Sequence, residues 1–182
     1  YSITQWEDFA GSEYRFRMSD YLDGTKVDEI VGKAVRQDDM VKVTYEIPVE
    51  VEEELPADAM FPTQHSLVLL KRAQDGEKFA NDLVFDGSGD TPTNRVAVVI
   101  SDRKDAANAA DDPDAIAQSP FHRMSLAFYP IGAAENGPTT EMAVDFAENG
   151  VAHAMRFDYG EFEVFGTLDK VNRLPMPDCG KQ

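Results

Sequence analysis

Large apolar side chains alternate with polar ones along most of this chain, and this period of two restricts the fold more than any other feature. Tyr14, Phe16 and Met18 alternate with polar residues, and an Asp-Gly pair at 23–24 supplies a turn. Further strands are expected at 27–35, 41–47, 83–85, 95–100 and 124–128, and at segments that begin at Met142, Val151 and Phe162. The pattern predicts a mostly β, antiparallel fold in a single domain over residues 1–182.

Asn149-Gly150 predicts the clearest hairpin, because this dipeptide accepts the positive φ angles of a type I′ turn. A two-residue loop also sets a register. It pairs Phe146 with His153, Val144 with Met155 and Met142 with Phe157 on an apolar face, and Ala147 with Ala152, Asp145 with Ala154 and Ala143 with Arg156 on the other.

One helix is expected over residues 61–73. Pro62 suits its first turn, Lys71 and Arg72 its last, and Gly76 its end. Leu67 and Leu70 are expected in an apolar stripe that packs on the curved inside of the sheet.

Three other segments are assigned by composition. We expect a second short helix at 77–82 and a solvated connector in the acidic run 50–54. Residues 101–119 hold only one large aliphatic side chain, Ile116, so they are expected to form a mobile acidic loop.

The charge excludes some classes of partner. The chain carries 34 acidic and 17 basic side chains, a formal charge of −17, which repels nucleic acid and anionic lipid surfaces. This surplus fits either a soluble surface or an acidic site for a basic partner, and both remain open. The longest apolar runs, 67–70 and 96–100, fall short of the roughly 20 residues that a membrane-spanning helix requires.

No group of residues has the spacing of a metal site, a cofactor site or a catalytic set. His65, His122 and His153 lie in no metal-binding motif. The run Asp86-Gly87-Ser88 is typical of a turn between strands, although its carboxylate could bind a cation or a partner. A hydrolase that uses His65 or His122 with Asp86 or Ser88 is the enzyme alternative.

Several of these stretches together resemble the cell-envelope-integrity protein B family. The resemblance rests on Leu55-Pro56, residues 60–65 with Phe61-Pro62, residues 84–88, residues 148–151, residues 157–160 with Tyr159-Gly160, and Leu174-Pro175-Met176-Pro177 before Cys179. The opening Trp6-Glu7 and Tyr14-Arg15-Phe16 fits the family too.

The resemblance implies a periplasmic protein of Gram-negative alphaproteobacteria that is made with a signal peptide. It implies an open, spiralling β-barrel with a helix on its concave side, and a disulfide from an N-terminal Cys to Cys179. Cys179 is the only cysteine, so we expect the chain to lack its N-terminal strands and the disulfide partner. By composition alone, an inert reduced Cys on a cytosolic tail is equally plausible.

The resemblance brings no catalytic residues and no cofactor. It implies a scaffold or interaction protein with a periplasmic protein partner, which maintains the envelope. A carrier of lipid or lipoprotein acyl chains is the alternative, because an incomplete barrel lined by Phe, Met and Leu offers a concave apolar surface.

Overall fold

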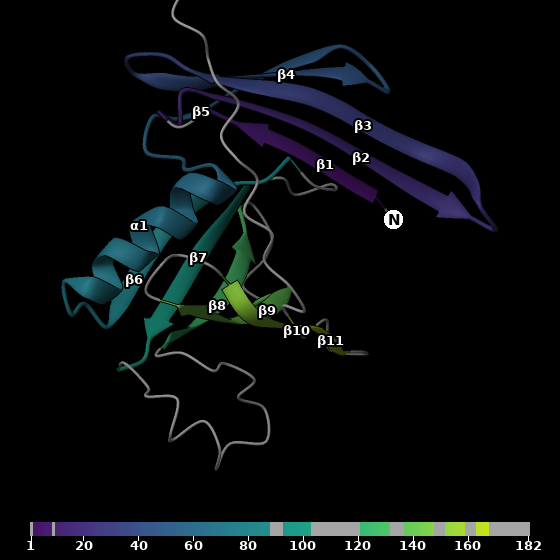
Figure 1. Ribbon diagram of the computed structural model, residues 1–182. Coiled ribbons are helices and arrows are strands. Elements are labelled where there is room, and N and C mark those ends of the chain that lie inside the picture. The colour runs from purple at the N-terminus through teal and green to yellow at the C-terminus, as the bar shows by residue number, and fades with distance from the viewer. Residues whose placement is uncertain are drawn as a thin grey trace, which may run out of the picture.

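Two antiparallel sheets and one helix make up the protein in a computed structural model, which describes residues 2–8, 10–87, 93–102, 121–131, 137–147, 152–158 and 163–167 (Figure 1). The elements are β1 (Ser2–Glu7), β2 (Glu13–Leu22), β3 (Thr25–Arg36), β4 (Met40–Ile47), β5 (Val51–Pro56), α1 (Pro62–Gln74), β6 (Phe79–Phe85), β7 (Thr93–Ile100), β8 (Phe121–Pro130), β9 (Thr140–Ala147), β10 (Ala152–Asp158) and β11 (Glu163–Thr167). The first sheet has the order β1-β2-β3-β4-β5 and the second the order β11-β10-β9-β8-β7-β6. Neither closes on itself within the described residues, and the expected mostly β, open antiparallel architecture is confirmed.

The alternation of β2 divides the first sheet into an inner and an outer face. Tyr14, Phe16 and Met18 are 1–3% exposed, whereas Arg15 and Arg17 between them are exposed. The expected turn at 23–24 is present, with φ angles of 51° and 77°. A bulge in β3 near the turn then shifts the register, so that Phe16 lies opposite Gly32.

Helix α1 forms where the sequence predicts it, but it buries a different stripe. Pro62 occupies the first turn, Lys71 and Arg72 the last, and Gly76 has a φ of 82° just beyond the end. The buried side chains are His65, Leu69, Leu70 and Ala73. Leu67 was expected in this stripe and is 55% exposed, because the buried line follows the i, i+4, i+8 spacing of 65, 69 and 73.

The interior has two parts. The helix-side core packs α1 on the inner face of the second sheet and contains Leu69, Leu70, Ala73, Val84, Val96, Val98, Ile100, Met124, Leu126 and Val144. The aromatic core lies under the first sheet and contains Tyr14, Phe16, Met18, Ala34, Val41, Val43, Ala59, Phe61 and Phe85. Strand β6 joins the two parts, because Val84 belongs to one and Phe85 to the other.

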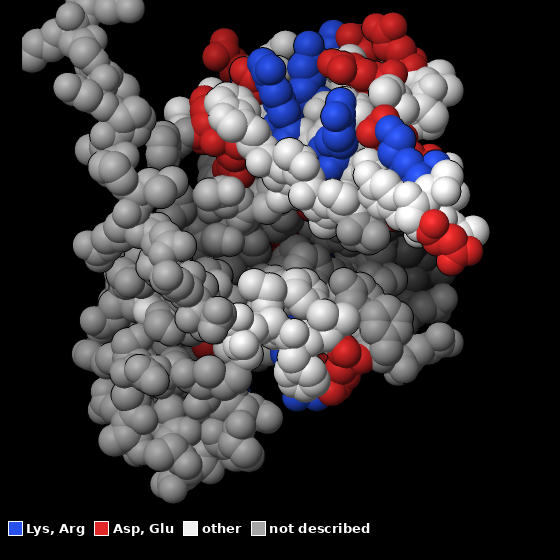
Figure 2. All heavy atoms as spheres, turned by 45° about the vertical axis from the view of Figure 1, so that its right-hand side comes forward, with Lys and Arg blue, Asp and Glu red and all other residues white. Residues whose placement is uncertain are grey.

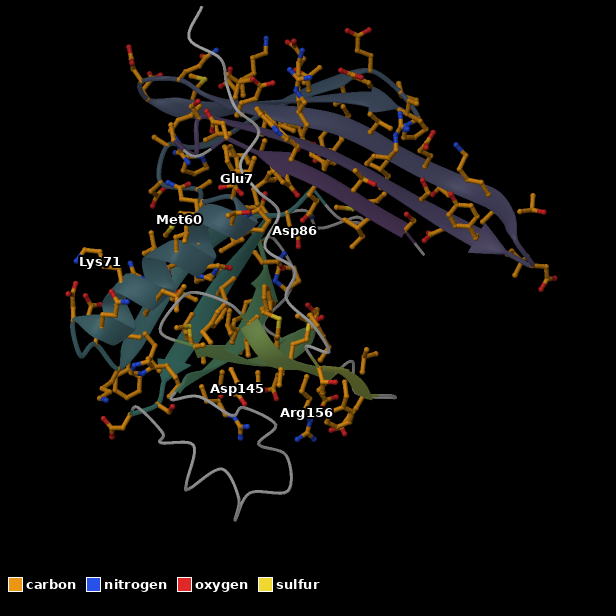
Figure 3. All side chains as sticks on the ribbon, in the orientation of Figure 1. Glu7, Met60, Lys71, Asp86, Asp145 and Arg156 are labelled. Atoms are coloured by element: carbon orange, nitrogen blue, oxygen red, sulfur yellow. The ribbon has the colours of Figure 1, made fainter. Side chains whose placement is uncertain are left out.

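Two charged side chains hold the start of α1 against the first sheet. The Glu7 carboxylate accepts hydrogen bonds from the backbone N–H groups of Thr63 and Gln64 at 2.9 and 2.8 Å, and so caps a helix that has no acidic residue in its own first turn (Figure 3). The Arg36 guanidinium donates to the carbonyl oxygens of Gly11, Ala57 and Ala59, to the Gln64 side chain, and packs over the Phe61 ring at 5.4 Å. The loop at Gly11, the end of β3, the 57–59 segment and the start of α1 therefore meet at one cation.

Two sequence assignments were wrong. Residues 77–82 do not form a helix: β6 begins at Phe79 and pairs with β7. The acidic run 50–54 is not a connector, because most of it lies in β5, which pairs with β4 at the edge of the first sheet. Edge strands tolerate exposed charges, which discourage pairing with other chains. The expected loop at 101–119 lies outside the described residues from 103 onward.

The hairpin prediction was correct in most of its register. Strands β9 and β10 are antiparallel, and Val144–Met155, Met142–Phe157, Asp145–Ala154 and Ala143–Arg156 are paired as expected. An irregularity between Ala152 and Ala154 places Ala152 opposite Phe146, so the two pairs expected nearest the turn are wrong. Asn149 and Gly150 lie outside the described residues.

Gly32 supplies a test of the aromatic core. A Cβ at this position would lie 2.5 Å from Phe16 Cζ and 2.8 Å from the Thr44 carbonyl oxygen. We expect Gly32→Ala to lower the free energy of unfolding by about 1–3 kcal/mol, measured by chemical denaturation. Val35→Ala, on the outer face of the same strand and 37% exposed, should cost clearly less. Equal losses for both variants would contradict the packing described here.

Candidate functional site

His65 lies in a buried polar cluster between α1 and β6. In this cluster Arg72 already balances the charge of Asp82. Its Nε2 is 3.2 Å from Asp82 Oδ2, and Arg72 Nη1 donates to the same oxygen at 2.6 Å. His65 and Asp82 are 5% and 7% exposed. Because Arg72 neutralises the carboxylate, a second cation gains little there, and burial lowers the pKa of His65.

The two histidines proposed for hydrolysis, His65 and His122, contact other groups of the fold. His65 is bonded to Asp82 and not to Asp86, and it is enclosed. On β8, His122 Nδ1 lies 3.3 Å from the carbonyl oxygen of Ser101. Ser88 and the side chain of His153 lie outside the described residues. The structure thus does not pair His65 or His122 with Asp86.

Phe61, Asp86 and Gly87 meet at the aromatic core, and Pro62 follows Phe61 as the first residue of α1. The Tyr14 hydroxyl donates to the Asp86 carbonyl oxygen at 2.9 Å. Gly87 has a φ of 75°, and a Cβ there would lie 2.8 Å from Phe16 Cδ2. Tyr14 and Phe61 stack with ring centroids 5.3 Å apart. These contacts position the end of β6 and the start of α1.

The motif residues Tyr159 and Gly160, and Cys179, lie outside the described residues.

A groove of about 320 Å³ lies on the outer face of the first sheet. We call it the Trp6 groove; its lining is Thr4, Trp6, Arg15, Phe16, Arg17, Val31, Gly32, Lys33 and Glu46. Trp6 is 52% exposed, and the Arg15 guanidinium lies 5.6 Å from its ring centroid. Figure 2 shows basic side chains gathered over this sheet, with acidic ones around them.

The register of three strands brings the basic side chains together. Trp6 of β1 lies opposite Arg15 of β2, and Arg15 lies opposite Lys33 of β3. Arg17 follows two residues along the same face of β2. Arg15 and Lys33 carry like charges directly opposite each other, and such a pair is unfavourable for the stability of the sheet.

A second groove, of about 530 Å³, lies on the face of the second sheet away from α1. Small side chains form its floor, and Val99, Tyr129, Glu141, Arg156 and Asp158 are at its sides. Figure 3 places Asp145 and Arg156 on this side of the sheet. Asp145 is 2% exposed and accepts two hydrogen bonds from Arg123, at 2.8 and 2.9 Å, so this pair braces β8 and β9.

Sequence reasoning missed both grooves and the Arg123–Asp145 pair. Arg15 and Arg17 alternate with apolar residues, which was a usable signal for a basic face. The position of Lys33 beside them, however, depends on the register between β2 and β3. Asp145 was assigned to the small or charged face, and its partner on β8 required a second register.

The described ranges hold neither a metal-binding cluster nor a membrane-spanning helix. These residues contain no group of three or more His, Cys, Asp or Glu that could hold a metal ion. They also contain no helix that is long and apolar enough to cross a membrane.

The comparisons with known proteins agree on one family. A family model described as EipB-like matches residues 1–175. The cell envelope integrity protein EipB of Brucella abortus (strain 2308) is 27% identical over 184 residues, which cover 98% of this chain and 63% of that protein. The chain therefore spans less than two thirds of the length of that relative.

A solved structure has the same fold. It is a beta-barrel-like protein of a domain of unknown function from Brucella abortus, with a TM-score of 0.80 and 25% sequence identity. The match covers 92% of this chain and 70% of that one.

The pKa of His65 leads to a pH-dependent stability. The unfolded side chain titrates near 6.5, and the folded one lower, so the unfolded chain binds more protons as the pH falls. The contribution of the neutral His65 side chain to the free energy of unfolding is complete above pH 6.5, and it is lost as the pH falls toward and through the folded pKa. We expect NMR titration of the imidazole to give a midpoint below 6.5, and His65→Gln to flatten the fall in unfolding free energy between pH 7.5 and 5.5. An unchanged pH profile in that variant would contradict this account.

Proposed function

Because this chain belongs to the EipB-like family, we propose that it maintains cell-envelope integrity as a non-catalytic binding protein of the periplasm. The observation that carries the proposal is the match to the cell envelope integrity protein EipB along 98% of the chain. The periplasmic compartment is part of the proposal, and the same relationship to a cell envelope protein supports it. The protein partner and the contact surface are further parts of the proposal.

The contacts of the reactive side chains support a non-catalytic role. A general base must reach a substrate, and His65 is buried and bonded to Asp82. Asp86 and Gly87 serve the aromatic core through a backbone carbonyl and a close contact with Phe16. The exposed aromatic and basic side chains lie instead on the outer faces of the sheets, where a partner can contact them.

The packing of α1 favours surface binding over the acyl-carrier alternative. A carrier would use the apolar inner face of the sheet. On the second sheet, Leu69, Leu70 and Ala73 of α1 pack against that face and are 1–8% exposed. The two grooves described above lie on the outer faces, and each includes charged side chains.

Deletion of the gene in its own host tests the proposed function. We expect the deletion strain to become sensitive to detergents and to cell-wall antibiotics, because its envelope lacks a component that maintains it. Sensitivity is measured by plating efficiency across a detergent series. The intact gene on a plasmid should restore resistance, and so should a His65→Gln copy if no catalysis is involved. Growth equal to wild type under every stress would remove the proposal.

Cys179 gives a second test, on the full-length mature protein. We propose that it forms a disulfide with a cysteine outside this chain. Closing a loop of more than a hundred residues would stabilise the fold by on the order of 4 kcal/mol in the chain-entropy model. The melting temperature should therefore fall on addition of reductant, and Cys179→Ser should abolish that response. Identical melting curves with and without reductant would count against the bond.

A further inference from the structure

The Trp6 groove combines three features that stability alone does not favour. The chain has twice as many acidic as basic side chains, yet Arg15, Arg17 and Lys33 lie side by side. Arg15 lies directly opposite Lys33, where an opposite charge would stabilise the sheet. Trp6, the only tryptophan of the chain, lies beside them and is half exposed. Departures from local consistency of this kind are expected at functional sites.

The basic side chains differ in how far their charges are balanced. Arg15 is paired with Glu13 at 2.6 Å. Arg17 is 3.7 Å from Glu29, and that carboxylate is closer to Lys26, at 3.0 Å. Lys33 makes no ion pair with any side chain in the described part of the protein. Arg17 and Lys33 can therefore bind a further anion with little loss of existing contacts.

The acidic side chains around the groove limit the size of that anion. Glu46 lines the groove itself, and Glu13 and Glu29 lie within 4 Å of Arg15 and Arg17 of its lining. A partner that covers about 800 Å², as a typical protein does, would meet these carboxylates, and so would a flat anionic membrane. The charge pattern thus fits a narrow ligand.

The floor of the groove argues against an acidic peptide that adds as a strand. It is formed by β2 and β3, and both strands are already paired on each side, with β1 and with β4. A peptide that extends a sheet needs a free edge. Here the ligand meets only side chains, with an aromatic ring at one side and Val31 and two cations nearby.

We propose that the Trp6 groove binds an acidic saccharide. The guanidinium of Arg17 and the ammonium of Lys33 would bind its carboxylates, and the Trp6 ring would pack on the C–H groups of a sugar ring. Arg15 stacks on the ring and supports its orientation. The inference deepens the proposed function. Saccharide binding itself does not depend on that function, but the role of the binding in the cell rests on it.

Trp6 makes the binding test specific, because all tryptophan fluorescence comes from this position. The protein is titrated with tri-galacturonic acid, with maltotriose as the neutral control. We expect a saturable change in fluorescence with the acidic trisaccharide alone, and weaker binding as salt is added.

Charge variants locate the site. Lys33→Gln should weaken binding about tenfold, and Arg17→Gln with Lys33→Gln should weaken it further. Lys42→Gln is the matched control, since Lys42 lies on the same sheet, pairs with Glu52 at 2.8 Å and does not line the groove. The melting temperature of Lys33→Gln should be unchanged or higher, because a like-charge contact is removed. A purely structural role for Lys33 predicts the opposite.

Three results would overturn the inference: no saturable response to the acidic trisaccharide, an equal response to maltotriose, or saturation only by tetraglutamate or by anionic phospholipid vesicles. In the cell, the double variant should fail to restore detergent resistance to the deletion strain. If it restores resistance fully while the intact gene is required, the groove is dispensable and the proposed function stands. If deletion has no effect, the proposed function fails while the binding result remains valid.

Discussion

The Arg36 guanidinium is the interaction on which the arrangement of the sheets depends. It reaches from the end of β3 to the carbonyl oxygens of the 57–59 segment and to the first turn of α1. Carbonyl groups buried at such a junction need donors, and one cation supplies several. Glu7 completes the junction with the opposite charge by capping the helix. These contacts fix the start of α1 relative to the first sheet. The buried side chains of α1 then pack against the second sheet and fix its position.

The same residues show how far a single sequence determines the fold. Alternation, the turn at 23–24 and the helix signals at Pro62 and Gly76 were sufficient for most strands and for α1, and Asn149-Gly150 for the β9–β10 pairing. They were not sufficient for the bulge in β3, which offsets the register by one residue and so decides which residues of β3 face the core. The acidic composition of β5 obscured a strand, because edge strands carry charges for reasons unrelated to their backbone pairing.

The candidate site was harder to predict than the fold for the same reason. Arg15 and Arg17 are visibly on one face, but their meeting with Lys33 exists only after the β3 bulge, and Trp6 joins them only through the β1–β2 pairing. The site is thus a property of register between three strands. Of the residues that attracted attention in the sequence, His65 is bonded to Asp82, and the backbone carbonyl of Asp86 accepts a hydrogen bond from Tyr14.

The strand order has a consequence for how the molecule assembles. Within the described residues, every strand of the two sheets pairs only with the strands next to it along the chain, so neither sheet contains a crossover connection. All five strands of the first sheet precede residue 57, and the remaining partners of Arg36 follow at Ala57, Ala59 and Gln64. Strands β1–β5 can pair before the later strands are available, but the aromatic core beneath them is completed only when β6 adds Phe85.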